Sequence, residues 1–278
     1  MKVIILKILS ALGLKLLKQA DYENIWRGLN SYRNLTHSMD LISRISPSLQ
    51  SSFQDIFIKN YKDARSQILQ DIFVLVVLGS KRNGYFIEAG ASDGLECSNT
   101  FLLEKNFDWK GLLVEPSREG FRQIGGNRKA IAINFALFSS SKDLIEFRET
   151  VSPGLSSLTD FSNNDYMSSQ RIDKSRYMVE TITLQDALKL ADAPKEIDFL
   201  SLDTEGSEFE ILKNFDFNSF TFSVIAVEHA FSEQREKVFD LLSSNGYKRV
   251  LSEISAYDDW YVNHKIVLEL GDRNIILD

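Results

Sequence analysis

The chain has 278 residues, of which 44% are hydrophobic and 26% are charged, and its formal net charge is −7 at pH 7. This composition excludes disordered and fibrous classes, and the acidic balance argues against a nucleic-acid partner, because phosphate binding needs a basic face. Cys97 is the only cysteine, which excludes an internal disulfide and fits a reducing, cytoplasmic compartment.

Residues 1–20 are rich in Ile and Leu but are interrupted by Lys2, Lys7, Lys15 and Lys18. These charges argue against a membrane-spanning helix, which needs about 20 predominantly apolar residues. Two alternatives remain for this segment. One is a helix lying on the inner face of a membrane, and the other is a helix packed on the rest of the protein or on a partner.

Two domains are predicted from the change in pattern near residue 80. Residues 1–80 predict a helical extension with a break at Pro47 and an apolar helix over 68–78. Residues 81–278 alternate short apolar runs with helical stretches, which predicts a Rossmann-like α/β fold with a mostly parallel seven-stranded sheet and an antiparallel edge. Strands are predicted at 85–89, 110–115, 130–138, 144–148, 179–181, 197–202, 222–227, 248–254 and 260–268, and helices at 99–106, 118–124, 184–191, 207–214 and 233–244.

Two segments of this second domain allow alternative interpretations. The stretch 150–176 is rich in Ser, Asn and Asp and is longer than an ordinary connection, so it forms either a lid or a disordered loop. The stretch 258–261 combines two acids with two aromatics. It either grips a polar ring or leads into a packed edge strand.

The first predicted strand ends in residues 88–94, Glu-Ala-Gly-Ala-Ser-Asp-Gly, and we call residues 90–94 the glycine turn. Glycines let the backbone bend sharply and let a ligand approach closely. The spacing lacks the compact cradle that holds a pyrophosphate, which favours a ligand such as S-adenosylmethionine. Glu88 or Asp93 is then expected to contact the cationic amino-acid end of that ligand. The alternative is an ordinary strand-to-helix turn.

An acidic residue at the end of the second strand supports nucleoside binding. Glu115 lies 21 residues after Gly94 and is followed by Pro116. A carboxylate at this position accepts hydrogen bonds from both ribose hydroxyls, whereas the alternative is a surface glutamate before a turn. After the third strand, Ala136 is predicted beside the adenine ring, unless residues 134–137 simply belong to the core.

The strands predicted at 197–202 and 222–227 end in polar residues. Asp203 and Glu205 occupy the crevice position where α/β sheets bind ligands, although carboxylates there also stabilise a helix N-terminus. Methylation of a hydroxyl requires removal of its proton, and His229 is the predicted base, with Asp203 orienting the acceptor. Alternatively, Asp203 and Glu228 hold a divalent cation such as Mg²⁺.

Taken together, these segments resemble the FkbM family of methyltransferases. The resemblance implies a class I methyltransferase fold and O-methylation, often of sugars in glycans or of secondary metabolites. It covers residues 84–268 and rests on segments 86–94, 98–100, 103–105, 111–116, 200–208 and 227–229. By this resemblance and the spacing, the predicted cofactor site comprises Glu88, Gly90, Ala91, Ser92, Asp93, Gly94, Asn99, Glu115, Pro116 and Ala136, and the predicted catalytic residues are His229, Asp203 and Glu205.

The sequence therefore predicts an S-adenosylmethionine-dependent O-methyltransferase that acts on a small-molecule or glycan acceptor. The alternative is a non-enzymatic interaction protein with a degenerate methyltransferase-like fold, attached to a membrane through residues 1–20. The intact glycines and carboxylates argue against that alternative. A nicotinamide-dependent oxidoreductase is disfavoured because the usual dinucleotide spacing is absent.

Overall fold

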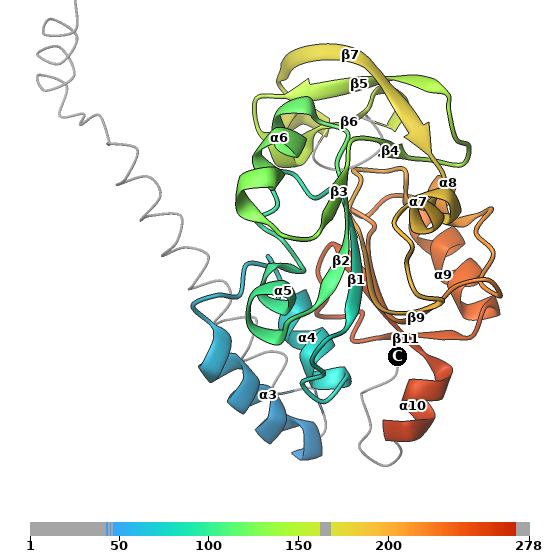
Figure 1. Ribbon diagram of the computed structural model, residues 1–278. Helices are drawn as coiled ribbons and strands as arrows, with labels where there is room; N and C mark the ends of the chain where they lie inside the picture. Colours follow the sequence, from blue (N-terminus) through green and yellow to red (C-terminus); the bar gives the residue numbers. More distant parts are fainter. Residues whose placement is uncertain (1–42, 44, 46, 162–167, 271–278) are drawn as a thin grey trace, which may run out of the picture.

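The computed structural model describes residues 43, 45, 47–161 and 168–270 (Figure 1). Within these residues no helix is both long and apolar enough to cross a membrane. The predicted helix over residues 1–20 lies outside the described residues, so both of its alternatives stay predictions.

A seven-stranded sheet forms the centre of the molecule, with strand order β10-β11-β9-β8-β1-β2-β3. The strands from β9 to β3 are parallel, and β11 runs antiparallel between β9 and β10. This arrangement confirms the predicted fold class. The strands are β1 (Tyr85–Ala89), β2 (Lys110–Val114), β3 (Ile131–Ile133), β8 (Glu196–Leu202), β9 (Thr221–Glu228), β10 (Tyr247–Val250) and β11 (Asp258–Asn263).

Helices cover both faces of this sheet, because alternate strand residues point to opposite sides. Phe86 and Phe199 pack into one core with α3, α4 and α5, whereas Ile87 and Leu200 pack into a second core with α7, α8 and α9. The helices are α3 (Pro47–Asn60), α4 (Gln70–Val77), α5 (Phe101–Phe107), α6 (Arg118–Asn127), α7 (Leu184–Leu190), α8 (Glu208–Leu212), α9 (Gln234–Ser244) and α10 (His264–Leu270).

The described helices that precede residue 80 belong to the core of the same sheet. Every residue of α4 is buried, and the Phe73 ring stacks on Trp260 with a centroid separation of 4.5 Å. Gln70 donates a buried hydrogen bond to Asp258 at 2.8 Å. The domain division at residue 80 stays a prediction, but α3 and α4 have no separate core.

A second sheet lies beyond the carboxyl ends of the parallel strands, at the top of Figure 1. Its strand order is β4-β7-β5-β6, and its members are β4 (Ala136–Leu137), β5 (Leu144–Thr150), β6 (Ser157–Leu158) and β7 (Asp173–Ile182). Short 3₁₀ helices at Pro153–Leu155, Thr159–Phe161 and Ser168–Gln170 connect β5, β6 and β7. The described parts of the stretch 150–176 are therefore built into this sheet, and residues 162–167 lie outside the described residues.

Two predicted strands around this second sheet were wrong. The strand predicted over 130–138 is two strands, because the chain leaves the central sheet after Ile133. There the Asn134 amide donates to the carbonyls of Glu115 and Pro116 at 2.7 and 3.1 Å. The short segment predicted at 179–181 is the end of the ten-residue β7.

The last predicted strands are shorter than expected. β10 ends at Val250, and Leu251 adopts a positive φ of 58°. β11 ends at Asn263, whose side chain accepts a hydrogen bond from the Lys265 N–H as α10 begins. Trp260 and Tyr261 are wholly buried in β11, so the stretch 258–261 forms a packed strand rather than an exposed ring-binding surface.

Candidate active site

The glycine turn packs directly against the end of β8. Gly90 has φ +80°, and a Cβ added to it would lie 1.7 Å from the Asp203 carbonyl oxygen. The Asp203 N–H donates to the Ala89 carbonyl at 3.1 Å. Glycine is required at position 90 because the two backbone segments touch there, and this contact places Asp203 beside the turn.

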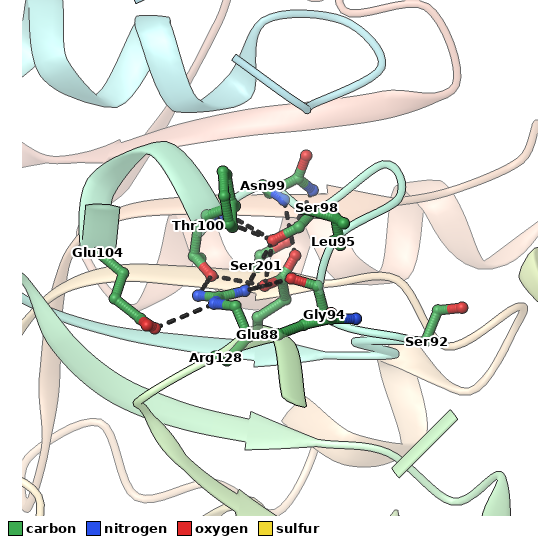
Figure 2. Close-up of polar contacts among 12 residues, drawn as sticks. Glu88, Ser92, Gly94, Leu95, Ser98, Asn99, Thr100, Glu104, Arg128 and Ser201 are labelled. Carbon is green, nitrogen blue, oxygen red and sulfur yellow. Dashed lines mark hydrogen bonds and ion pairs between the residues drawn. The ribbon is translucent and has the colours of Figure 1, made fainter. Parts of the chain in front are cut away.

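The Glu88 carboxylate faces the loop that follows the turn (Figure 2). One oxygen accepts the Asn99 N–H at 2.6 Å, and the other accepts the hydroxyls of Ser98 and Thr100 at 2.9 and 2.5 Å. Because both oxygens are engaged, Glu88 shapes residues 98–100 from inside the protein. Direct contact of Glu88 with a ligand stays a prediction, and this geometry does not favour it.

Arg128 completes this network, and sequence reasoning missed it. Its side chain is fully buried and donates to the Gly94 carbonyl at 3.0 Å and to Thr100 at 2.8 Å. It also forms ion pairs with Glu88 at 3.5 Å and Glu104 at 3.0 Å. Figure 2 shows the guanidinium between these groups. Arg128 follows α6 and stands beside Lys129, so no periodic pattern singles it out.

Asn99 contributes an unpaired acceptor to the same region. Its amide nitrogen donates to the Ser201 hydroxyl at 2.9 Å, while its Oδ1 is buried and has no hydrogen-bond partner within the described residues. Buried polar atoms are nearly always hydrogen-bonded. The orphaned oxygen therefore fits a ligand that brings an N–H or O–H donor. Asp93, by contrast, closes the turn locally by accepting the N–H groups of Leu95 and Glu96, both at 2.8 Å.

Glu115 lies against the glycine turn, as its spacing predicted. Its two oxygens accept the N–H groups of Ser92 at 2.6 Å and of Ser117 at 2.7 Å. Burial raises the pKa of Glu115 to about 7, and the negative charge of Asp203 contributes to the rise. Each carboxyl oxygen still has a lone pair with which to accept a hydroxyl.

The other predicted cofactor residues fall into two groups. Ala91 is buried within the glycine turn, and Pro116 is half-buried directly after Glu115. Ala136 lies in β4, where it pairs with Thr181 and packs in the core of the second sheet. Contact of Ala136 with an adenine ring stays a prediction.

Three carboxylates meet at the carboxyl ends of β8 and β9, and we call Asp203, Glu205 and Glu228 the acid cluster. One oxygen from each lies within 4.8 Å of the others. The pairing of Leu202 with Val227 in the sheet brings Asp203 and Glu228 side by side.

Burial makes this cluster retain a proton. It raises the pKa of Asp203 to about 6. It raises the pKa of Glu228 well above the ordinary range, and the charge of Asp203 raises it further. The two carboxyl groups are hydrogen-bonded to each other, which requires a proton between them. Glu228 therefore holds a proton more strongly than Asp203 does.

The second sheet closes over the third member of the cluster. Glu205 has a positive φ of 59° and forms an ion pair with the buried side chain of Arg171, which precedes β7. A Cβ added to Gly206 would lie 3.2 Å from Phe161 in the same connecting segment. Sequence reasoning missed Arg171, because its partner is far away along the chain. Glu208, the first residue of α8, accepts the Thr204 N–H at 2.8 Å.

The His229 side chain contacts the loop after β9 and lies beside Asp259 of β11. It is 5% exposed, and its Nδ1 accepts the Phe231 N–H at 3.0 Å. Its Nε2 lies 3.8 Å from Asp259, whose carboxylate pairs with Arg235 at 2.6 Å. Burial lowers the pKa of His229 to about 4. The role of His229 as a base stays a prediction.

The fold and this site together define a class I methyltransferase. The sheet is mostly parallel with one antiparallel strand, and a glycine turn and carboxylates lie at the carboxyl ends of adjacent strands. The chain belongs to the methyltransferase FkbM domain family, which matches residues 88–249, more than half of the chain. This match confirms the resemblance seen in the sequence.

Solved structures similar to this chain include methyltransferase FkbM from Methylobacillus flagellatus KT, at 13% identity and a TM-score of 0.41. That alignment covers 83% of this chain, which spans 59% of the FkbM structure. The METTL16 MTase domain is similar at 14% identity and a TM-score of 0.36, over 71% of this chain and 68% of that one. A SAM-dependent methyltransferase from Aquifex aeolicus is similar at 12% identity and a TM-score of 0.34, over 75% and 96%. The comparison with curated proteins gave no match.

Proposed function

We propose that the protein transfers a methyl group from S-adenosylmethionine to a hydroxyl group, on a sugar of a glycan or on a secondary metabolite. One observation carries this proposal. The backbone of Asp203 touches Gly90, while Glu115 is hydrogen-bonded to Ser92 on the same turn. A nucleoside-binding carboxylate and a proton-accepting carboxylate therefore adjoin a single glycine turn.

The residues around the turn fit the donor. Glu115 has lone pairs for the ribose hydroxyls, and the buried Oδ1 of Asn99 lacks a partner within the described part of the chain and suits the ammonium of the amino-acid end. The acid cluster provides negative charge for a sulfonium. The bound donor supplies a methyl group that is already activated by its positively charged sulfur.

Asp203 and Glu228 divide the remaining chemistry. The ionised Asp203 accepts the proton of the acceptor hydroxyl, and a pKa of about 6 makes it a competent base near neutral pH. Glu228 keeps the shared proton and stabilises the negative charge of Asp203 through their hydrogen bond. Catalysis then consists of positioning the two reactants and removing one proton.

Binding of the donor is the direct test of this proposal. Calorimetry with S-adenosylmethionine should show saturable heat for the wild type and an affinity about ten-fold lower for Glu115→Gln, because one charged hydrogen-bond acceptor is lost. Glu180→Gln, on the exposed face of β7, is the matched control and should bind like the wild type. A wild type without saturable heat would support the alternative of a non-enzymatic scaffold.

A divalent cation is the second candidate for activating the hydroxyl. Carboxylate oxygens are the ligands that Mg²⁺ prefers, and three of them lie within 4.8 Å of one another in the acid cluster. Arg171 and the shared proton already neutralise part of this cluster. We therefore expect methyl transfer to persist after treatment with EDTA. Loss of transfer with EDTA and its recovery with Mg²⁺ would instead assign the cluster to the metal.

A further inference from the structure

Residues 65–71 form the start of α4 and the chain that leads into it, and we call them the α4 entry segment. They precede residues 88–249, over which the family matches, and so lie outside the family domain. The buried carboxylate of Asp71 accepts the Ser66 hydroxyl at 2.5 Å and the Arg65 N–H at 3.2 Å. These internal contacts fix the shape of the segment.

The Gln67 amide of this segment joins two loops that are far apart in the sequence. Its Nε2 donates to the Cys97 Sγ at 3.4 Å, and its Oε1 accepts the Tyr257 hydroxyl at 2.8 Å. Cys97 lies on the loop that follows the glycine turn, whereas Tyr257 directly precedes β11. Because both ends of the amide are engaged, Gln67 holds the two loops at one separation.

The loop on the Cys97 side carries the residue assigned to the amino-acid end of the donor. Two positions after Cys97, Asn99 presents its buried Oδ1, which has no hydrogen-bond partner within the described residues. Glu88 and Ser201 hold Asn99 from the interior (Figure 2). Cys97 has a positive φ of 59°, a conformation that persists only where neighbouring groups stabilise it. Gln67 supplies such a contact from the other side of the loop.

The loop on the Tyr257 side is tied to the reaction end of the site. The Tyr257 carbonyl accepts the His229 N–H at 2.8 Å. The next residue, Asp258, lies opposite Glu228 in the sheet and accepts a hydrogen bond from Gln70 of the entry segment at 2.8 Å. The entry segment is therefore anchored to this loop at two points, which gives the Gln67 amide a firm support.

We propose that Gln67 is a positioning residue for the methyl donor. It holds the loop of Cys97 against Tyr257, so that Asn99 Oδ1 stays where the ammonium of S-adenosylmethionine binds. This inference rests on the proposed function. It also gives a role to a segment that precedes the family domain.

The proposal confines the effect of Gln67 to one end of the donor. The ribose is assigned to Glu115, whose hydrogen bonds to Ser92 and Ser117 do not involve the loop of Cys97. Loss of the Gln67 amide should therefore weaken ligands that carry the amino-acid end and spare ligands that lack it. General damage to the fold would weaken both kinds of ligand.

The test compares two ligands that share the adenosyl group. S-adenosylhomocysteine carries the amino-acid end, and 5′-methylthioadenosine lacks it. By calorimetry with the full-length protein, Gln67→Leu should bind S-adenosylhomocysteine about five-fold more weakly than the wild type, as expected for the loss of one hydrogen bond. Its affinity for 5′-methylthioadenosine should be that of the wild type. Gln54→Leu, on the exposed face of α3, is the matched control and should leave both affinities unchanged.

A milder variant decides the test if Gln67→Leu does not fold. Tyr257→Phe removes only the hydroxyl that Gln67 accepts, and it should weaken S-adenosylhomocysteine selectively as well. In a folded variant, an equal loss of both ligands or an unchanged affinity for S-adenosylhomocysteine would overturn the inference. Absence of saturable heat from the wild type with both ligands would refute the proposed function. Binding of both ligands by the wild type without a selective loss in the variants refutes only the role of Gln67.

Discussion

The two ends of the active site differ in how far their carboxylate charges are neutralised by neighbouring groups. At the glycine turn, Glu88 is surrounded by donors and paired with Arg128. At the acid cluster, burial raises the pKa of both Asp203 and Glu228, and the charge of Asp203 raises the pKa of Glu228 further. The first arrangement fixes a loop, whereas the second stores unfavourable electrostatic energy that a cationic ligand can release.

This contrast separates stability from function within one sheet. Removing Glu88 or Arg128 from their network should destabilise the fold, because the charge of the other residue is left buried and unpaired. Neutralising a member of the acid cluster should instead relieve repulsion and impair the reaction. Strain of this kind is typical of functional sites and is stabilised by the surrounding structure.

The largest expected effect is a loss of stability when the buried network of Glu88, Glu104 and Arg128 is broken. Arg128→Met should lower the free energy of unfolding by about 3–5 kcal/mol, because Glu88 and Glu104 lose their buried cation. Urea denaturation measures this change. The control Arg122→Met removes an arginine whose side chain is 73% exposed and should change stability by less than about 0.5 kcal/mol. Equal effects of the two substitutions would show that the network is not structural.

The next effect concerns the base. Asp203→Asn should lower methyl transfer by about 10²–10⁴-fold, because proton removal by a positioned group contributes about that much. Transfer is measured with tritiated S-adenosylmethionine and a panel of methyl glycosides, and donor affinity by calorimetry should change only a few-fold. If His229→Asn removes activity and Asp203→Asn does not, the base is His229, as the sequence predicted.

The smallest effect is a gain in stability with a defined pH dependence. The pKa of Glu228 is raised in the folded protein, so its contribution to stability is fully present below about pH 4.5 and is lost as the pH rises. Glu228→Gln removes this loss and should make the protein more stable at pH 8, relative to its stability at pH 5, than the wild type is. Denaturation at both pH values measures the difference. A variant that is less stable than the wild type at pH 8 contradicts the assigned repulsion.

The parts of the fold that the sequence predicted well are those with buried, continuous apolar strands. β1, β2, β8 and β9 are bounded by glycine or polar residues, and their ends carry the predicted Gly90, Glu115 and Asp203. The positions of these residues follow from the strand boundaries alone. Spacing was therefore sufficient to bring Glu115 to the glycine turn.

The parts that the sequence did not predict depend on long-range contacts. β7 is largely exposed and rich in charged residues, so it shows no apolar run that would reveal its length. Arg128 and Arg171 gain their roles only when distant carboxylates fold against them.

The central claim is that the glycine turn and Glu115 together hold an adenosyl group. A crystal structure of the protein with S-adenosylhomocysteine tests it most directly. We predict both ribose hydroxyls within hydrogen-bond distance of Glu115 and the ligand ammonium on Asn99 Oδ1. An adenosyl group bound elsewhere, with Glu115 contacting only Ser92 and Ser117, would contradict the claim.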